Sequence, residues 1–157
     1  MGRQVVALVV CLAIVFAAGM IGTPFTVKAT KTWYLEVSKP AWTPPNWVFA
    51  PVWTALYAMM AVAAWLVWRQ GGFAEHPWAL GLFCVQLALN ASWTPVFFGL
   101  RAFGAAFGII ALMWVAILAT MIAFFRVSVP AGWLMAPYLG WVGYASTLNY
   151  AIAFAGR

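Results

Sequence analysis

Charged residues are scarce in this chain, and one acidic residue type is missing altogether. Of its 157 residues 6% are charged, whereas a soluble domain carries roughly a quarter. Asp is absent, the two carboxylates are Glu36 and Glu75, and the single histidine is His76. These residues supply no paired carboxylates, no Ser-His-Asp set and no cluster of metal ligands. The composition therefore argues against hydrolytic chemistry and predicts neither a metal site nor a required cofactor.

The eight basic and two acidic residues all fall outside five uncharged runs. Each run is long enough to cross about 30 Å of hydrocarbon once, which requires roughly 20 helical residues. The sequence therefore predicts an all-α integral membrane protein, a five-transmembrane-helix bundle in one domain over residues 1–157. The helices are expected at about 5–21, 47–68, 77–98, 102–125 and 131–154. No span holds an ionisable side chain of the kind that proton-coupled carriers use.

Other architectures explain the apolar runs less well. A transmembrane barrel would alternate apolar and polar residues, and the run 109–115 does not. An odd number of spans without self-similarity argues against an inverted-repeat transporter. Arg3 ahead of an apolar stretch that ends near Ala17-Ala18-Gly19 also fits a cleavable signal peptide, and this alternative stays open for the first run.

The net charge of +6 comes from single basic residues between the spans. Without a basic patch the charge indicates anionic lipid headgroups as partners rather than nucleic acid. One side of the membrane would hold Arg3, Arg69 and Arg126, and the other Lys28, Lys31, Lys39, Arg101 and Arg157. The positive-inside rule places the larger set in the cytoplasm, so the first loop and the C-terminus are expected on one side and the N-terminus on the other.

The connection 24–46 is the longest between two predicted spans and is rich in proline and aromatic residues. Connections of this length are uncommon and tend to be functional. Its rings, Trp33, Tyr34 and Trp42, are candidates either for anchors at the membrane interface or for a lid over the bundle.

Polar and aromatic side chains form stripes on three predicted helices. Amides in lipid must find partners, so these stripes are expected to face the bundle interior. The residues are Gln86, Asn90, Trp93 and Phe97 on one helix, Tyr138, Trp141, Ala145, Leu148 and Asn149 on another, and Trp53 and Tyr57 on a third. From spacing alone, the stripes either hold the helices together or line a ligand pocket.

A face of small residues lies opposite the first stripe and consists of Gly81, Cys84, Ala88 and Ala91. Small residues allow close helix approach, so this face is a candidate homodimer seam. Gly104 and Gly108 offer a GxxxG alternative on the next helix, and either set could instead serve packing within the chain. Cys11 and Cys84 lie within spans, where they are expected to pack as thiols.

Three motifs identify a resemblance that covers nearly the whole chain. The first begins with Trp33-Tyr34 and continues with KPAWTPPNWVF at 39–49 into PVWTALY at 51–57. The second is QLALNASWTPVFFG at 86–99, and the third runs from Pro137-Tyr138-Leu139 through Trp141 to Thr147-Leu148-Asn149-Tyr150. In these motifs the sequence resembles the translocator protein family, also called tryptophan-rich sensory proteins (TspO) or peripheral-type benzodiazepine receptors. The run W-x-P-P-x-W-x-F is the most specific of them.

The resemblance implies a dimeric five-helix receptor or sensor in the membrane, of the bacterial type and in the cell envelope. Its ligands would be tetrapyrroles such as protoporphyrin IX or haem, and synthetic benzodiazepines or isoquinoline carboxamides, and it would transport tetrapyrroles or regulate their levels. Trp53, Asn90, Trp93, Trp141 and Ala145 match the family's pocket, with Tyr34 and Trp42 in its lid. A flat tetrapyrrole would then stack on Trp53 and Trp141, and Gln86 and Asn90 would form hydrogen bonds with its polar edges.

The same resemblance implies two alternatives. The first is a light- and oxygen-dependent enzyme that degrades porphyrins with Trp53 and Trp141 as redox groups. The second is a sterol translocator, but the sterol motif allows at most five residues between its tyrosine and its basic residue. Six residues separate Tyr150 from Arg157, so a tetrapyrrole role fits the sequence better.

Overall fold

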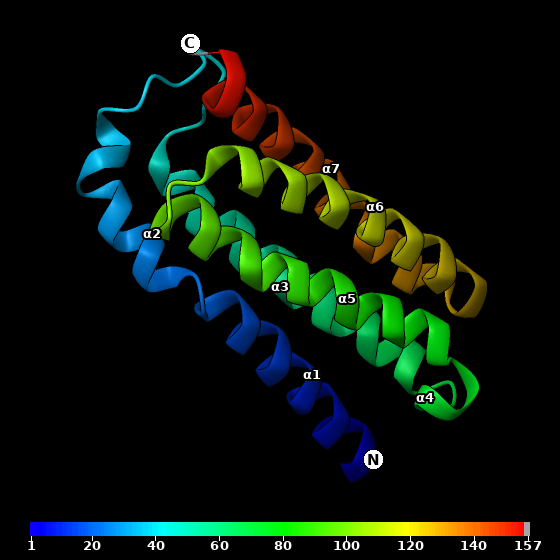
Figure 1. Ribbon diagram of the computed structural model, residues 1–157. Coiled ribbons are helices and arrows are strands. Elements are labelled where there is room, and N and C mark those ends of the chain that lie inside the picture. Colours follow the sequence, from blue (N-terminus) through cyan, green and yellow to red (C-terminus); the bar gives the residue numbers. More distant parts are fainter. Residues whose placement is uncertain (156–157) are drawn as a thin grey trace.

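Five long helices cross the molecule in alternating directions in the computed structural model, which describes residues 1–155 (Figure 1). They are α1 (Gly2–Met20), α3 (Asn46–Trp68), α5 (Pro77–Thr94), α6 (Phe103–Val127) and α7 (Val129–Tyr150). Around the bundle each helix packs on the next in the order α1, α3, α7, α6 and α5. Arg157, which was assigned to the cytoplasmic side, lies outside the described residues.

Four segments of the described chain are long and apolar enough to cross a membrane: Gly2–Thr30, Asn46–Trp68, Pro77–Gly99 and Phe103–Val127. The fifth long helix, α7, is 22 residues long. It contains Pro137 and several tyrosines, tryptophans and glycines, and these residues lower its hydropathy. It nevertheless packs against both α3 and α6 as a full member of the bundle. The expected class, an all-helical integral membrane protein, is confirmed.

The first connection is more ordered than the sequence predicted, because it holds a sixth, short helix in addition to the five long ones. A sixth helix, α2 (Thr23–Thr30), follows α1 after a short turn, and a 3-10 turn η1 (Trp33–Leu35) comes next. Pro24 lies in the first turn of α2, where the missing N–H costs nothing. The residue that was expected only to end the first helix therefore also begins α2. The hydroxyls of Thr26 and Thr30 each donate to the carbonyl four residues earlier. Only residues 31–45 remain as a connection to α3.

The remaining elements are short. A four-residue turn, α4 (Gly72–Glu75), joins α3 to α5, and Gly71 at φ +132° makes the sharp entry to it. Two π-helical ends, η2 (Pro95–Gly99) and η3 (Ala151–Ala155), extend α5 and α7. Pro95 has no N–H for an α-helical bond, and this favours the wider turn at the end of α5.

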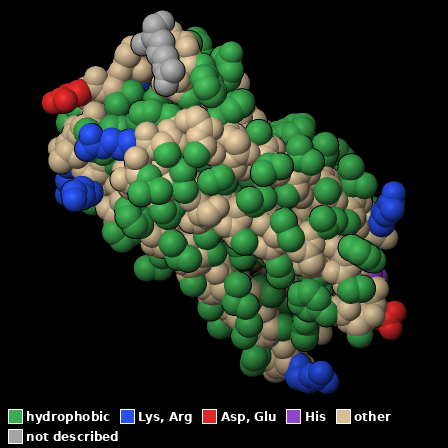
Figure 2. Space-filling model, in the orientation of Figure 1, with side chains coloured by type: hydrophobic (Ala, Val, Ile, Leu, Met, Phe, Trp, Pro, Cys, Tyr) green, Lys and Arg blue, Asp and Glu red, His purple; other side chains and the backbone are tan. Residues whose placement is uncertain are grey.

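Apolar side chains fill the bundle and also cover its outside. Fully buried residues such as Met60, Ile117 and Met135 fill the interior, while large apolar side chains such as Val6, Leu112 and Trp133 are exposed. Figure 2 shows hydrophobic side chains over the middle of the visible face and Lys, Arg and acidic groups toward its two ends. This distribution suits a hydrocarbon surrounding, because in lipid exposed apolar surface costs nothing.

The two ends of the bundle differ. The N-terminus and α4 lie at one end, and residues 31–45 lie at the other together with the end of the described chain (Figure 1). Each end holds one of the two cavities described below.

Candidate functional site

A cavity of about 380 Å³ lies at the end of the bundle that carries residues 31–45. Its wall is built from α1 and α2 on one side, the first turns of α3 on another, and the ends of α5 and α7 on the rest. Tyr34 of η1 closes it from above. We call residues 31–45 the lid segment, after the role expected of them, and Tyr34 is their one residue in the cavity wall.

Six of the expected ligand-binding residues come together in this wall. They are Tyr34, Trp53, Tyr57, Trp93, Trp141 and Ala145. The rings of Trp53 and Tyr57 lie 5.5 Å apart between centroids, as their one-turn spacing on α3 predicts. Indole and phenol rings from three long helices therefore converge on one apolar space, which suits a flat aromatic ligand.

Trp141 is distinguished from the other rings by its indole nitrogen. Its Nε1 is buried and, within residues 1–155, is the one such side-chain atom without a hydrogen-bond partner. Buried indole N–H groups usually find a partner, so this nitrogen, which lies out of reach of the open space of the cavity, is an exception among the described residues. Phe49, which the list of expected site residues omitted, lines the cavity and meets the Trp141 ring edge-on at 5.9 Å.

The buried amides do not face the cavity, and this corrects their expected role. Asn90 accepts a hydrogen bond from the Tyr57 hydroxyl at 3.1 Å and donates one to the Tyr138 hydroxyl at 2.9 Å. Tyr138 in turn donates to Gln86 at 2.8 Å. This series of hydrogen bonds links α3, α5 and α7. Its amides are paired within the protein, which polar groups in a lipid surrounding require. Gln86 and Asn90 therefore hold the helices together in this structure, with Tyr57 as the member that also lines the cavity.

Three other expected residues also lie behind the wall rather than in it. Phe97, Tyr138 and Leu148 are buried and do not line the cavity. Phe97 stacks under Trp93 with 5.1 Å between ring centroids, so it supports a ring that does line the cavity. A further polar contact, from Trp93 Nε1 to Asn149 Oδ1 at 3.0 Å, fixes the same ring from α7.

The lid segment is fastened at several points. Tyr34 is 5% exposed, its ring packs edge-on against Phe98 at 5.4 Å, and burial raises the pKa of its hydroxyl. Lys39 Nζ donates to the Tyr34 carbonyl at 2.6 Å and lies 4.2 Å from the centre of the same ring. The Arg101 guanidinium lies 4.7 Å from the centre of the Trp33 ring. These contacts make the lid segment part of the folded bundle.

Trp42 does not seal the cavity as expected. Its side chain is 56% exposed and is not part of the cavity wall. Its backbone carbonyl instead accepts a hydrogen bond from the Tyr144 hydroxyl on α7. The lid segment is therefore held here through its main chain, which no side-chain pattern could indicate.

Two glycines let α1 and α2 approach the rest of the wall. A Cβ at Gly19 would lie 2.4 Å from the Tyr57 ring, and one at Gly22 would lie 2.4 Å from Thr94. Both glycines line the cavity, together with Thr23, Thr26, Asn46 and Thr54, none of which was expected. The signal for them was weak, because single glycines and threonines near a helix end are common in any membrane protein.

The small-residue face lies on the outside of α5. Gly81 has no atom within 4 Å of an added Cβ, and Ala88 is exposed. Ala91 is half-buried, and Cys84 is exposed at the edge of a second cavity beside α1. The alternative Gly108 is equally open, with nothing within 4 Å of an added Cβ.

An apolar helical bundle with an aromatic cavity beneath a lid is the architecture of a receptor-like integral membrane protein. A sequence profile described as the TspO/MBR family matches residues 9–155, and the chain belongs to this family. It is 41% identical over 156 residues to the tryptophan-rich protein TspO of Chlorobaculum tepidum, covering 97% of each chain. It is 42% identical to the human translocator protein over 134 residues, 84% of this chain and 79% of that protein. It is also 40% identical to the tryptophan-rich sensory protein of Cereibacter sphaeroides over 139 residues, 88% of this chain and 86% of the relative.

Proposed function

We propose that this protein is a membrane receptor for tetrapyrroles such as protoporphyrin IX, which it binds in the cavity beneath the lid segment. The observation that carries the proposal is the arrangement of Trp53, Trp93 and Trp141 around one apolar space. Flat conjugated ligands gain from stacking on such rings, and the few polar atoms of the wall fix their orientation.

Once the Trp141 ring turns its buried N–H toward a bound molecule, this group is expected to select a class of ligand rather than one compound. Its natural partner is an oxygen acceptor on the edge of a planar aromatic molecule. Porphyrin carboxylates and the carbonyl groups of benzodiazepines and isoquinoline carboxamides all supply one. The cavity is expected to discriminate against planar hydrocarbons without an acceptor, which would leave the N–H unpaired.

The cavity is small for a macrocycle. Its volume of about 380 Å³ is near the lower end of the roughly 300–1,000 Å³ of ligand pockets. We expect a tetrapyrrole to displace the lid segment outward at Tyr34 when it enters, and to leave by the same movement. A receptor that delivers or senses tetrapyrroles would use this step as its gate.

Titration with protoporphyrin IX tests the proposal in detergent or nanodiscs. Saturable quenching of tryptophan fluorescence, competed by an isoquinoline carboxamide, is the expected result. Absence of saturable binding would contradict it. The bound pigment is then recovered after incubation in the dark and in light with oxygen. Unchanged pigment in both supports the receptor, whereas loss of the Soret band with a new product in light alone would identify the porphyrin-degrading enzyme.

A further inference from the structure

A second and larger cavity lies at the opposite end of the bundle, where α1 diverges from α5. Its volume is about 700 Å³, and its walls are α1, the end of α3 and the first turns of α5. Phe73 of α4 and Trp68 of α3 lie at its outer end, and Ile14, Val15 and Leu87 lie at its inner end. No residue is shared with the cavity beneath the lid segment.

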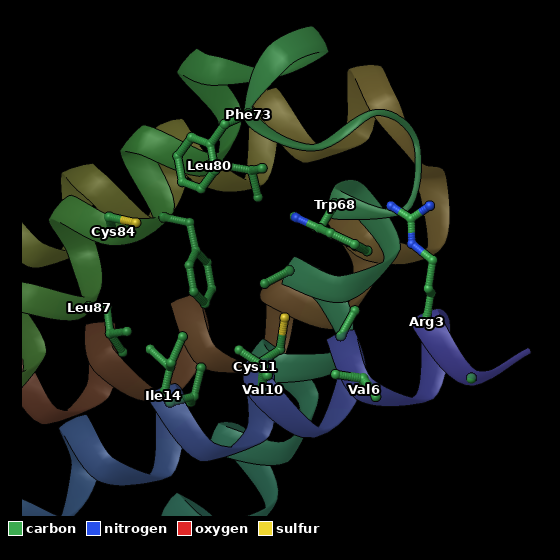
Figure 3. Close-up of a pocket in the computed structure, with 15 residues that line it drawn as sticks. Arg3, Val6, Val10, Cys11, Ile14, Trp68, Phe73, Leu80, Cys84 and Leu87 are labelled. Carbon is green, nitrogen blue, oxygen red and sulfur yellow. The ribbon is translucent and has the colours of Figure 1, made fainter.

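The chemistry of this cavity is apolar with one exception. Arg3 is the only charged residue of the wall, and Figure 3 shows its side chain rising from α1 beside Trp68. Neither carboxylate of the chain, Glu36 or Glu75, lines the cavity. A cation at one end of an apolar slot, without an acid in the wall to neutralise it, is complementary to an anionic headgroup that carries a hydrocarbon chain.

A second cation stands close to the same end. The Trp65 indole donates to the carbonyl of Gln4, the neighbour of Arg3, at 3.1 Å. The Arg69 guanidinium lies 5.0 Å from the centre of the Trp65 ring. Arg3 therefore lines the outer end of the cavity, and Arg69, which is not in the wall, lies at the same end of the bundle by the polar turn between α3 and α5.

The depth of the cavity matches one leaflet of a membrane. Along α1 the wall runs from Arg3 to Val15, about 18 Å at 1.5 Å per residue. Half of a hydrocarbon core of roughly 30 Å is about 15 Å. The apolar slot thus begins at the surface and ends near the middle of the bilayer, where an acyl chain also ends.

We infer that this cavity binds one acyl chain of an anionic phospholipid, with the headgroup on Arg3. The lipid fills the space that separates α1 from α5 and so completes the packing of α1, in which Val15 is the only buried residue. This site is independent of the proposed tetrapyrrole function, because the two cavities lie at opposite ends and use different residues.

Native mass spectrometry of the full chain, delipidated in mild detergent and offered phosphatidylglycerol or phosphatidylcholine, tests the inference. The wild type is expected to retain phosphatidylglycerol preferentially. Arg3→Gln should lower that preference by about fivefold, the effect of one basic residue near an anionic headgroup. Arg126→Gln is the matched control, because it removes a cation from the last turn of α6 at the same end of the bundle and outside the cavity wall.

A pair of bulky substitutions tests the place of the acyl chain. Ala7→Phe fills the cavity and should reduce retention of both lipids, whereas Val9→Phe adds the same bulk to an exposed position of α1 outside the wall and should not. Protoporphyrin binding at the other cavity serves as the test of folding for all four variants if the wild type binds it, and thermal unfolding serves otherwise.

The two cysteines of the chain provide a readout in the unmodified protein, because Cys11 and Cys84 both line this cavity. Phosphatidylglycerol should slow their reaction with monobromobimane more than phosphatidylcholine does at the same concentration. Equal retention and equal protection by the two lipids would overturn the inference. So would unchanged selectivity in Arg3→Gln, or a lipid-free dimer that Ala7→Phe dissociates, which would place a second chain in the cavity.

Discussion

The indole nitrogen of Trp93 donates a hydrogen bond to Oδ1 of Asn149 at 3.0 Å, and this bond ties a ring of the cavity wall to α7. Asn149 is 1% exposed, and its Nδ2 donates to the carbonyl of Phe103 at 2.9 Å. One amide therefore positions a cavity ring and anchors the start of α6 at the same time.

Replacement of this amide should affect both stability and binding. Asn149→Ala leaves the Trp93 N–H without its partner, which costs about 1–3 kcal/mol for a buried group, and it also removes the bond to the Phe103 carbonyl. We expect a lower midpoint of thermal unfolding in detergent and a weaker protoporphyrin affinity. Ser92→Ala is the control, because the exposed Ser92 hydroxyl bonds only within its own helix. Wild-type stability in Asn149→Ala would contradict this role.

The Tyr138 hydroxyl joins two amides in the buried chain, as acceptor from Asn90 and donor to Gln86. Tyr138→Phe removes both bonds without removing the ring, so it should lower the free energy of unfolding by about 1–3 kcal/mol. Protoporphyrin affinity should change little, because neither Tyr138 nor the two amides lines the cavity. Tyr150→Phe, at a 53% exposed position, is the matched control. A Tyr138→Phe variant that keeps its stability but loses protoporphyrin binding would place these hydrogen-bonded side chains in the ligand site.

Trp141 should contribute through both its ring and its nitrogen. Trp141→Phe keeps an aromatic ring but removes the N–H, so ligands with an oxygen acceptor should bind about 2- to 12-fold more weakly, the equivalent of one hydrogen bond of about 0.5–1.5 kcal/mol. Trp141→Ala should cost more, because stacking is lost as well. Fluorescence titration measures both, with Trp133→Phe as control at a 65% exposed position outside the cavity. Equal affinity of wild type and Trp141→Phe would show that the orphan nitrogen has no part in binding.

The lid segment offers a pair of variants whose order the structure predicts. Tyr144→Phe removes the hydroxyl that holds the Trp42 carbonyl, so protoporphyrin should dissociate about 2- to 12-fold faster. Trp42→Ala keeps that bond and removes an exposed ring, so the dissociation rate should hardly change. Stopped-flow measurement of pigment release distinguishes the two. Faster release in Trp42→Ala alone would restore the side chain as the seal.

The homodimer seam expected from the sequence is tested by adding bulk to the open faces. Ala88→Phe on α5 should separate subunits by steric clash without reaching the ligand cavity. Gly104→Leu with Gly108→Leu tests the alternative face on α6. Cross-linking in nanodiscs that yields monomer only in the α6 variant would move the seam there.

The positions of the long helices followed from the sequence alone. An uncharged run of 24 to 30 residues has one outcome in lipid, because a backbone without water must satisfy its own hydrogen bonds and a helix does so locally. The same reasoning turned Gln86 and Asn90 inward, and both are buried. The convergence of Trp53, Trp93 and Trp141 was expected from the helical stripes and from the family resemblance together.

What each inward group meets was decided by the tertiary structure. A stripe of residues shows which way side chains point from one helix, whereas a hydrogen bond depends on the distance between two helices. The sequence therefore did not decide whether the amides bond to a ligand or to Tyr57 and Tyr138. Helix α2 and the outward side chain of Trp42 likewise depend on contacts across the bundle. The larger cavity beside α1 arises from the angle at which one helix leaves another. An angle between two helices is set by all the side chains packed between them, and no single run of residues encodes it.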